Sequence, residues 1–272
     1  MSAALDKLRV RVAASGSMLC IGLDSANARL PERFTRVNHP QLDFNRWVIE
    51  STLPYVAAYK PNLAFYEARG PAGWEALRRT MVWLRDTAPD VFTIADAKRA
   101  DIGSTNAGYV EGLFDELGFD AVTLHPYLGR EALTPFLERE DKASIVLCRT
   151  SNPGAGELQD LLVDGRPLWE VVATTVRDEW NARGNCMLVV GATYPDELAR
   201  VRELCPDIPF LVPGVGAQGG DVDAVVGGGL DASGGGLLIN ASRSVIFADD
   251  PATEAKALRD AIASAADRRS GA

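Results

Sequence analysis

The sequence is poor in the side chains that most often bind transition metals. It has only two histidines, His39 and His125, and they are far apart in the chain, so histidine-based metal chemistry has little material to work with. None of the four cysteines has a C-x-x-C spacing, and three of them lie in or beside apolar segments typical of strands. This pattern predicts buried free thiols rather than disulfides, a zinc site or a nucleophile. The cysteines are Cys20, Cys148, Cys186 and Cys205.

Long apolar segments and runs of basic residues are also missing. No stretch reaches the length that spans a membrane, and charges interrupt the first 16 residues, where a signal peptide would need an apolar centre. No Lys/Arg run exceeds a pair, and the formal net charge is -9 at pH 7. We therefore expect a cytoplasmic protein that binds neither nucleic acid nor a membrane, although a locally positive pocket can still bind a small anionic substrate.

The chain does contain a repeated alternation of short apolar runs and amphipathic stretches of helical length. Gly73–Thr87, for instance, places Leu77, Met81 and Leu84 at spacings of three and four, which is typical of a helix with one buried face. The apolar runs indicate strands buried on both faces, and strands joined by helices must be parallel. The eight predicted strands are Met18–Leu23, Tyr55–Tyr59, Val91–Ala95, Ala121–Leu124, Ser144–Cys148, Met187–Val190, Pro209–Val212 and Leu237–Ile239.

Eight such units favour a closed barrel over an open sheet. We therefore predict an α/β protein with the (β/α)8 TIM barrel fold, in which residues 1–272 form a single catalytic domain. Ala3–Ala14 is expected to add a helix before the first strand. The glycine-rich stretch Gly227–Gly236 is expected to be a flexible connection before the last strand rather than a domain linker.

Polar residues that follow the C-terminal ends of the strands in such a barrel point into one shared site. Asp96 and Lys98 are two residues apart at the end of the third strand, and Asp101 follows on the turn into the next helix. Taken alone, this triplet favours a simpler explanation, an N-cap at Asp101 beside a solvated charge cluster. Lys60 and Asp24 shift the interpretation from a solvated charge cluster to a functional site. The barrel brings their strand ends to the same mouth, where alternating charges hold one another in place.

The segment from Asp96 to Thr105 resembles the signature of the orotidine 5'-phosphate decarboxylase family, in the pattern Asp96-x-Lys98-x-x-Asp101-Ile102 followed by Thr105. The resemblance covers nearly the whole chain, and the long stretch from Gly156 to Arg183 is similar to a bacterial subgroup found in mycobacteria and their relatives. Further matching pieces follow in the order that the family shows: IGLD ending at Asp24, Lys60, SNPGA from Ser151, PGVGAQGG from Pro213 with Gln218, and Arg243.

This resemblance implies an enzyme that converts orotidine 5'-phosphate (OMP) to UMP and carbon dioxide, the last step of de novo pyrimidine biosynthesis, without metal or organic cofactor. It makes Lys98 the general acid that protonates C6 of the pyrimidine, with Asp96 beside the departing carboxylate and Lys60 bridging Asp96 and a ribose hydroxyl. A vinyl carbanion has no ring position over which to delocalise, so a fixed ammonium and the exclusion of water must stabilise it. The resemblance also implies a homodimer with shared active sites, in which Asp101 and Thr105 reach the partner's site.

The same resemblance assigns the remaining substrate-binding residues. Asp24 binds the ribose and Ser151 the pyrimidine edge. Gln218 closes over the phosphate and Arg243 pairs with it, in agreement with the tendency of this fold to hold phosphate after strands seven and eight. The full expected substrate-binding set is Asp24, Ile102, Thr105, Ser151, Pro213, Gln218 and Arg243.

Three other functions stay open. A sugar-phosphate decarboxylase or aldolase of the same superfamily resembles the chain at Asp96-x-Lys98, but it uses magnesium and typically has a glutamate where this chain has Lys60. Gly214-x-Gly216-x-x-Gly219 superficially matches a dinucleotide fingerprint, yet it follows the seventh strand and lacks the required acidic residue about twenty positions on. A non-catalytic nucleotide-binding protein is disfavoured by the intact set of Asp96, Lys98 and Asp101.

Overall fold

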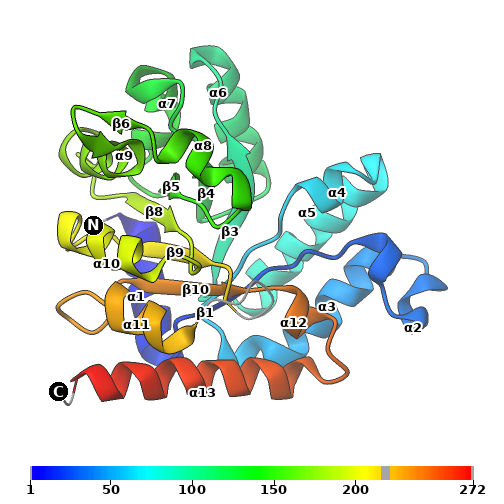
Figure 1. The fold of residues 1–272 in the computed structure, drawn as a ribbon. Helices are drawn as coiled ribbons and strands as arrows, with labels where there is room; N and C mark the ends of the chain where they lie inside the picture. The colour runs from blue at the N-terminus through cyan, green and yellow to red at the C-terminus, as the bar shows by residue number, and fades with distance from the viewer. Residues whose placement is uncertain (1, 216–220, 271–272) are drawn as a thin grey trace.

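Eight parallel strands close into a barrel in the computed structural model, which describes residues 2–215 and 221–270 (Figure 1). The order around the barrel is β1-β10-β9-β8-β5-β4-β3-β2. This arrangement confirms the predicted (β/α)8 TIM barrel. The strands are β1 (Leu19–Ile21), β2 (Ala58–Tyr59), β3 (Phe92–Arg99), β4 (Ala121–Leu124), β5 (Ala143–Arg149), β8 (Cys186–Val190), β9 (Phe210–Pro213) and β10 (Leu237–Ala241).

All eight predicted strands are present, and the differences lie in their bounds. The second was predicted over Tyr55–Tyr59, but β2 is shorter, because Leu53–Tyr55, with a proline in its middle, forms the 3-10 turn η2. The third was predicted to end at Ala95, whereas β3 continues to Arg99. Its last four residues are mainly charged, and a pattern of apolar residues cannot detect a strand end that carries a polar site.

Helices surround the barrel and cover its N-terminal end. The predicted first helix is confirmed as α1 (Ala3–Ser15), and its buried residues belong to the same cluster as the side chains inside the barrel. The predicted helix Gly73–Thr87 is confirmed within α5 (Gly70–Thr87). The other helices are α2 (Glu32–Thr35), α3 (Pro40–Thr52), α4 (Ala64–Glu67), α6 (Gly103–Val110), α7 (Gly129–Leu137), α8 (Gly156–Gln159), α9 (Leu168–Thr175), α10 (Pro195–Leu204), α11 (Val222–Gly229), α12 (Arg243–Ile246) and α13 (Pro251–Ser270).

Short π-helical and 3-10 turns extend or link these helices: η1 (Asn27–Arg29), η3 (Glu111–Glu116), η4 (Pro153–Ala155) and η5 (Val176–Trp180). The long C-terminal helix α13 closes the ring by packing between α11 and α3 (Figure 1). No helix in the part of the chain that the structure describes is both long and apolar enough to cross a membrane.

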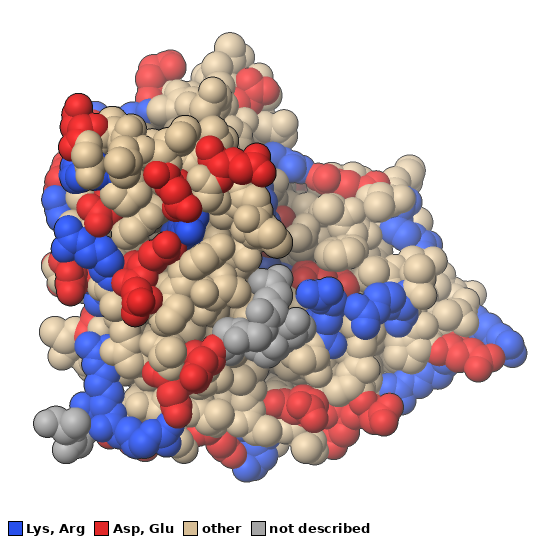
Figure 2. Space-filling model, viewed as in Figure 1, with Lys and Arg blue, Asp and Glu red and all other residues tan. Residues whose placement is uncertain are grey.

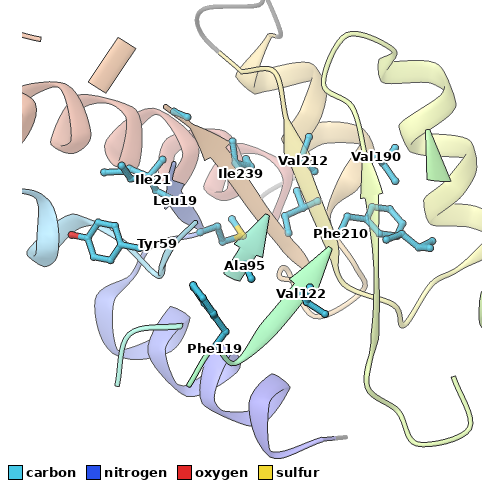
Figure 3. Close-up of a cluster of buried hydrophobic side chains, with 14 of the residues drawn as sticks. Leu19, Ile21, Tyr59, Ala95, Phe119, Val122, Val190, Phe210, Val212 and Ile239 are labelled. Atoms are coloured by element: carbon cyan, nitrogen blue, oxygen red, sulfur yellow. The ribbon is translucent and has the colours of Figure 1, made fainter. Parts of the chain in front are cut away.

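The barrel strands are buried on both faces, as their apolar runs predicted. Leu19 and Ile21 of β1 point outward into the core between strands and helices, which Figure 3 shows, whereas Cys20 between them belongs to the cluster inside the barrel. All four cysteines are buried and free, which confirms the prediction of free thiols. Burial raises the pKa of the Cys20 and Cys186 thiols to about 12, so both are protonated at neutral pH.

The stretch Gly227–Gly236 differs from the predicted flexible connection. Its first three residues complete helix α11, and the rest forms a hydrogen-bonded turn around Asp231. The Asp231 carboxylate accepts from the backbone N–H groups of Ser233 and Gly235 at 2.8 and 3.0 Å. An aspartate that bonds the backbone two residues on is a local turn signal that outweighs the glycine content here. A two-stranded antiparallel hairpin, β6 (Leu162–Val163) and β7 (Arg166–Pro167), lies in the long segment after Ser151.

Candidate active site

A cavity of about 730 Å³ opens at the C-terminal ends of the barrel strands. Figure 2 shows the surface hollowed between the α3–α5 side of the molecule and the rest of the barrel, with both acidic and basic side chains around the hollow. The cavity has two chemically different halves. One half contains Asp24, Lys60, Asp96 and Lys98, which lie at the ends of the neighbouring strands β1, β2 and β3. The other half contains Leu147, Val189 and Leu211 of the neighbouring strands β5, β8 and β9.

The charged half is organised around Asp96, which is buried near the end of β3. Its Oδ2 accepts a hydrogen bond from Lys60 Nζ at 2.7 Å, and its Oδ1 accepts one from Lys98 Nζ at 2.5 Å. Lys60 follows the neighbouring strand β2 and is buried, whereas the Lys98 side chain is 50% exposed and faces the cavity. The predicted convergence of these three residues is confirmed: one buried carboxylate holds two ammonium groups.

The two lysines keep this carboxylate ionised. Burial alone raises the pKa of Asp96, but the adjacent positive charges and hydrogen bonds of Lys60 and Lys98 outweigh it and hold the pKa well below its usual range. Burial alone lowers the pKa of Lys60, but the negative charges of Asp96 and Asp24 outweigh this effect, so the net result is a raised pKa of Lys60. At neutral pH the site therefore contains a fixed carboxylate and a fixed buried ammonium, with the Lys98 side chain at the cavity surface.

The end of β3 is irregular where Lys98 stands. Ala95 pairs with Val122 of β4 and Arg99 pairs with Leu124, so four steps along β3 lie opposite two steps along β4. Lys98 adopts a left-handed backbone conformation, with φ at 45°, which is uncommon for a residue with a side chain. The prediction that Asp96 and Lys98 meet is confirmed, but a β-bulge brings them together rather than the simple alternation of a regular strand.

Asp24 follows β1 and lines the same cavity. Its Oδ1 is buried and has no hydrogen-bond partner within the part of the chain that the structure describes. The chain approaches closely here, because a Cβ on Gly22 would lie 1.9 Å from Ser242 Oγ and 3.3 Å from Asp24 Oδ2. The missing side chain at Gly22 therefore allows Ser242 and Asp24 to lie close to β1. Separately, the unpaired Asp24 Oδ1 is an acceptor for a hydroxyl of a bound ligand.

Ser151 lies on the opposite side of the mouth, after β5, and also lines the cavity. The absence of a side chain at Gly191 lets it approach, since a Cβ there would lie 2.9 Å from Ser151 Cβ. Gln159 of helix α8 makes two hydrogen bonds to Thr150, the residue before Ser151. Its Oε1 accepts from the Thr150 backbone N–H at 3.0 Å, and its Nε2 donates to Thr150 Oγ1 at 2.9 Å. Gln159 belongs to the long stretch from Gly156 to Arg183, and this stretch therefore helps to hold the loop that carries Ser151 in place.

Of the remaining expected substrate-binding residues, Pro213 and Arg243 line the cavity, and Gln218 lies outside the described residues. Arg243 is exposed and begins the short helix α12 after β10. Arg29 lines the cavity as well, with its guanidinium 4.4 Å from the centroid of the Phe247 ring. Two arginines therefore border the β10 side of the mouth, where an anionic group can be held.

Asp101, Ile102 and Thr105 do not line the cavity of their own chain. The Asp101 Oδ1 accepts from the adjacent Ile102 N–H at 2.6 Å, and helix α6 begins at Gly103 with Ile102 in the N-cap position and no side-chain cap. The simpler explanation of Asp101 as an N-cap is therefore wrong. Ile102 is 60% exposed, and Thr105 is also exposed on the first turn of α6.

Sequence reasoning missed several residues that line the cavity with polar atoms. Thr123 stands inside an apolar strand, so nothing in the pattern marks it as part of the site. Asn240, by contrast, directly follows the predicted strand Leu237–Ile239 and was therefore expected at the barrel mouth; its Oδ1 is buried and has no partner among the described residues. Gln159 lies in the long stretch from Gly156 to Arg183, where no pattern of apolar and polar residues indicates that a side chain reaches the barrel mouth.

A parallel eight-stranded barrel with paired lysines and a carboxylate at its C-terminal mouth defines a TIM-barrel enzyme. Comparison with known proteins is consistent with this class and narrows it. The profile of the Orotidine 5'-phosphate decarboxylase / HUMPS family matches residues 17–258. This chain belongs to that family. Assignment to a subgroup found in mycobacteria stays a prediction.

Individual relatives match the chain over nearly its whole length. An orotidine 5'-phosphate decarboxylase from Herpetosiphon aurantiacus is 49% identical over 256 residues, which span 94% of this chain and 93% of that protein. The corresponding protein from Cellvibrio japonicus is 46% identical over 259 residues, spanning 93% and 94%. The solved structure of Leishmania donovani OMP decarboxylase has a TM-score of 0.87 and 41% identity, covering 98% of this chain and 99% of its own.

Proposed function

We propose that this protein converts OMP to UMP and carbon dioxide, the last step of UMP biosynthesis, and that residues 1–272 act as a single cytoplasmic catalytic domain without metal or organic cofactor. Two relatives named orotidine 5'-phosphate decarboxylase are identical to this chain at nearly half of the aligned positions, which supports this reaction. The observation that carries the proposal is the chain of contacts Lys60–Asp96–Lys98 on the floor of the cavity.

The reaction breaks the bond between C6 of the pyrimidine and its carboxylate, and the electron pair stays on C6. Carbon dioxide leaves, and Lys98 donates a proton from its ammonium to C6, after which water reprotonates the lysine. The Lys98 ammonium stabilises the developing negative charge because Asp96 holds it in place before the reaction begins. The apolar side chains Leu147, Val189 and Leu211 reduce the access of water to the ring.

The other half of the substrate provides binding energy. Asp24, with its unpaired oxygen, accepts a hydrogen bond from a ribose hydroxyl, and Lys60 bridges Asp96 and the ribose. Ser151 binds the pyrimidine edge from the loop after β5. Arg243 pairs with the phosphate, and Pro213 and Gln218 complete the set of substrate-binding residues.

The active form is a homodimer with shared sites, in which Asp101, Ile102 and Thr105 of one subunit complete the site of its partner. Their place outside their own cavity supports this assignment. Exposed apolar side chains lie on this side of the barrel, because Ile102, which follows β3, is 60% exposed and Tyr127, which follows the neighbouring β4, is 88% exposed. A second copy of the chain would cover this apolar surface.

The decisive experiment follows the loss of orotate absorbance when the purified protein is mixed with OMP. Saturable loss of absorbance, with UMP as the product, supports the proposal. A protein that binds UMP but leaves OMP unchanged would instead be a nucleotide-binding relative without this activity.

The shared site has its own test. Lys98→Ala and Asp101→Ala proteins, each nearly inactive, are unfolded together and refolded in equal amounts. Random pairing makes about half of the dimers mixed, and each mixed dimer has one wholly wild-type site, so roughly a quarter of wild-type activity should return. Refolding that demonstrably yields mixed dimers without recovered activity would remove the partner assignment of Asp101 and Thr105.

A further inference from the structure

Thr123 is a buried threonine of β4 that lies directly against the catalytic groups. It is 1% exposed, and it lines the cavity beside Asp96 and Lys98. Its Oγ1 makes two hydrogen bonds of 3.0 Å: it accepts from the Lys98 backbone N–H and donates to Asp96 Oδ1. One side-chain hydroxyl therefore connects the backbone of one charged residue to the carboxylate of the other.

The β-bulge explains why this hydroxyl is needed. Between the pairs Ala95–Val122 and Arg99–Leu124, Thr123 is the single residue of β4 that lies opposite the extra residues of β3. The bulge takes the Lys98 N–H out of the regular ladder, and a buried N–H without a partner is unfavourable. The Thr123 hydroxyl takes the place of the missing carbonyl acceptor.

The direction of the second hydrogen bond follows from the chemistry of a hydroxyl. Thr123 Oγ1 has one proton, and because it accepts from the Lys98 N–H, that proton is free to point at Asp96 Oδ1. The same carboxylate oxygen receives the Lys98 ammonium at 2.5 Å. The backbone and the ammonium of Lys98 are thus both tied to one oxygen atom of Asp96.

We propose that Thr123 is a positioning residue for the decarboxylation: its hydroxyl holds the left-handed backbone of Lys98 and the Asp96 carboxylate in one fixed relation, so that the Lys98 ammonium is aimed before the substrate reacts. This role rests on the proposed function. It acts through Lys98 and Asp96, so it affects the chemical step far more than the binding of OMP, which depends on the ribose and phosphate contacts.

The test compares Thr123→Val, which removes the hydroxyl and keeps the shape, with Thr123→Ser, which keeps the hydroxyl. Losing a hydrogen bond to a charged group should lower kcat for OMP by about ten- to a hundredfold while KM changes by less than about threefold. Thr123→Ser should restore kcat to within about threefold of wild type. If the valine variant does not fold, Thr123→Ala removes the same hydroxyl and serves in its place.

The chain offers a matched control on strand β3 itself. Thr93 is also a buried threonine, and its hydroxyl donates to Asp120 Oδ2 at 2.9 Å and accepts from the Asp120 backbone N–H at 3.2 Å. It has the same pair of bonds as Thr123, but it lies near the start of β3 and does not line the cavity. Thr93→Val should therefore lower stability by a similar amount and leave kcat within about threefold of wild type.

Several outcomes would overturn the proposal: an unchanged kcat in Thr123→Val, a serine variant as impaired as the valine variant, or an equal loss of kcat in Thr93→Val. Crystal structures of wild type and Thr123→Val separate this proposal from the proposed function. If the wild-type protein does not turn over OMP, the proposed function is wrong. The positioning role is tested independently by the structures, because it requires the Lys98 Nζ and Asp96 Oδ1 atoms to move apart in Thr123→Val. An unchanged arrangement of those atoms would refute it.

Discussion

Replacing Asp96 with asparagine should destabilise the fold, because the substitution leaves the ammonium of Lys60 buried without its nearest partner. The Lys60 side chain is 5% exposed, and its Nζ lies 2.7 Å from Asp96 Oδ2. Breaking a buried ion pair by removing one partner typically lowers the free energy of unfolding by about 3–5 kcal/mol. The charge of Asp24 also acts on Lys60 and remains in the variant, so we expect about 3 kcal/mol. In a chain of this size that loss lowers Tm by about 6–12 °C.

Lys98→Met is the matched comparison for this prediction. It removes an ammonium whose side chain is 50% exposed, and Asp96 keeps its contacts with Lys60 and Thr123. Ion pairs open to solvent contribute little, so the free energy of unfolding should fall by less than about 1 kcal/mol. Thermal and urea unfolding at pH 7 measure both variants, and we expect both to lose turnover while only Asp96→Asn loses substantial stability.

The pH dependence gives this prediction its sharpest test. In the wild type the pKa of Lys60 is raised above its usual 10.5, so its stabilising effect is present at neutral pH and is lost only as pH rises through the folded-state pKa. In Asp96→Asn, burial dominates and lowers the pKa of Lys60. The buried, unpaired ammonium therefore reduces the free energy of unfolding at neutral pH, and this loss becomes smaller as rising pH removes the proton from Lys60. The difference in stability between the two proteins should therefore narrow between pH 7 and about pH 10. A difference that is absent at pH 7, or that widens with pH, would refute the reasoning.

Three further predictions concern catalysis. Turnover of OMP should survive complete chelation of divalent metal, because the positive charges beside the leaving group belong to Lys60 and Lys98; activity that is lost with chelator and restored by magnesium would place the protein in the magnesium-dependent branch of its superfamily. Lys98→Ala should lower kcat by about a hundred- to ten-thousandfold and the affinity for UMP by far less, and proportional losses would make Lys98 only a binding residue. Arg243→Ala should lower kcat/KM for OMP by about ten- to a hundredfold and hardly change it for the nucleoside without phosphate, whereas equal losses would indicate a structural role.

Much of the fold could be predicted from the sequence because its signals are local and repeated. Each strand is a short apolar run, since both of its faces are buried, and β4 was predicted with its observed bounds, Ala121–Leu124. The signals failed where a polar interaction replaced an apolar one. The predicted third strand stopped at Ala95 because the residues after it are charged, and the turn after Gly229 is ordered by the Asp231 carboxylate rather than by apolar packing.

The candidate site was predictable to the extent that topology determines it. Asp24 and Lys60 follow β1 and β2, and Asp96 lies near the end of β3, so closing the barrel is sufficient to bring them together. The β-bulge was not predictable, because it depends on how β3 and β4 pair rather than on either sequence alone. Thr123 is hidden for the same reason: a β-branched residue in an apolar strand is ordinary, and only the pairing places it opposite Lys98.

The order of strands around the barrel accounts for the division of the cavity into two halves. Because β1, β2 and β3 are neighbours, the carboxylate of Asp96 is within reach of Lys60 across a single strand boundary. Because β5, β8 and β9 are also neighbours, Leu147 and Val189 lie together on the other side of the cavity. Charge is therefore concentrated on one side of the cavity, where our proposal places the departing carboxylate and the arriving proton, and the other side is a surface to which water makes no hydrogen bonds. An ammonium held in such surroundings stabilises a developing carbanion more strongly than it would in water, since the local dielectric is lower and the group is already oriented.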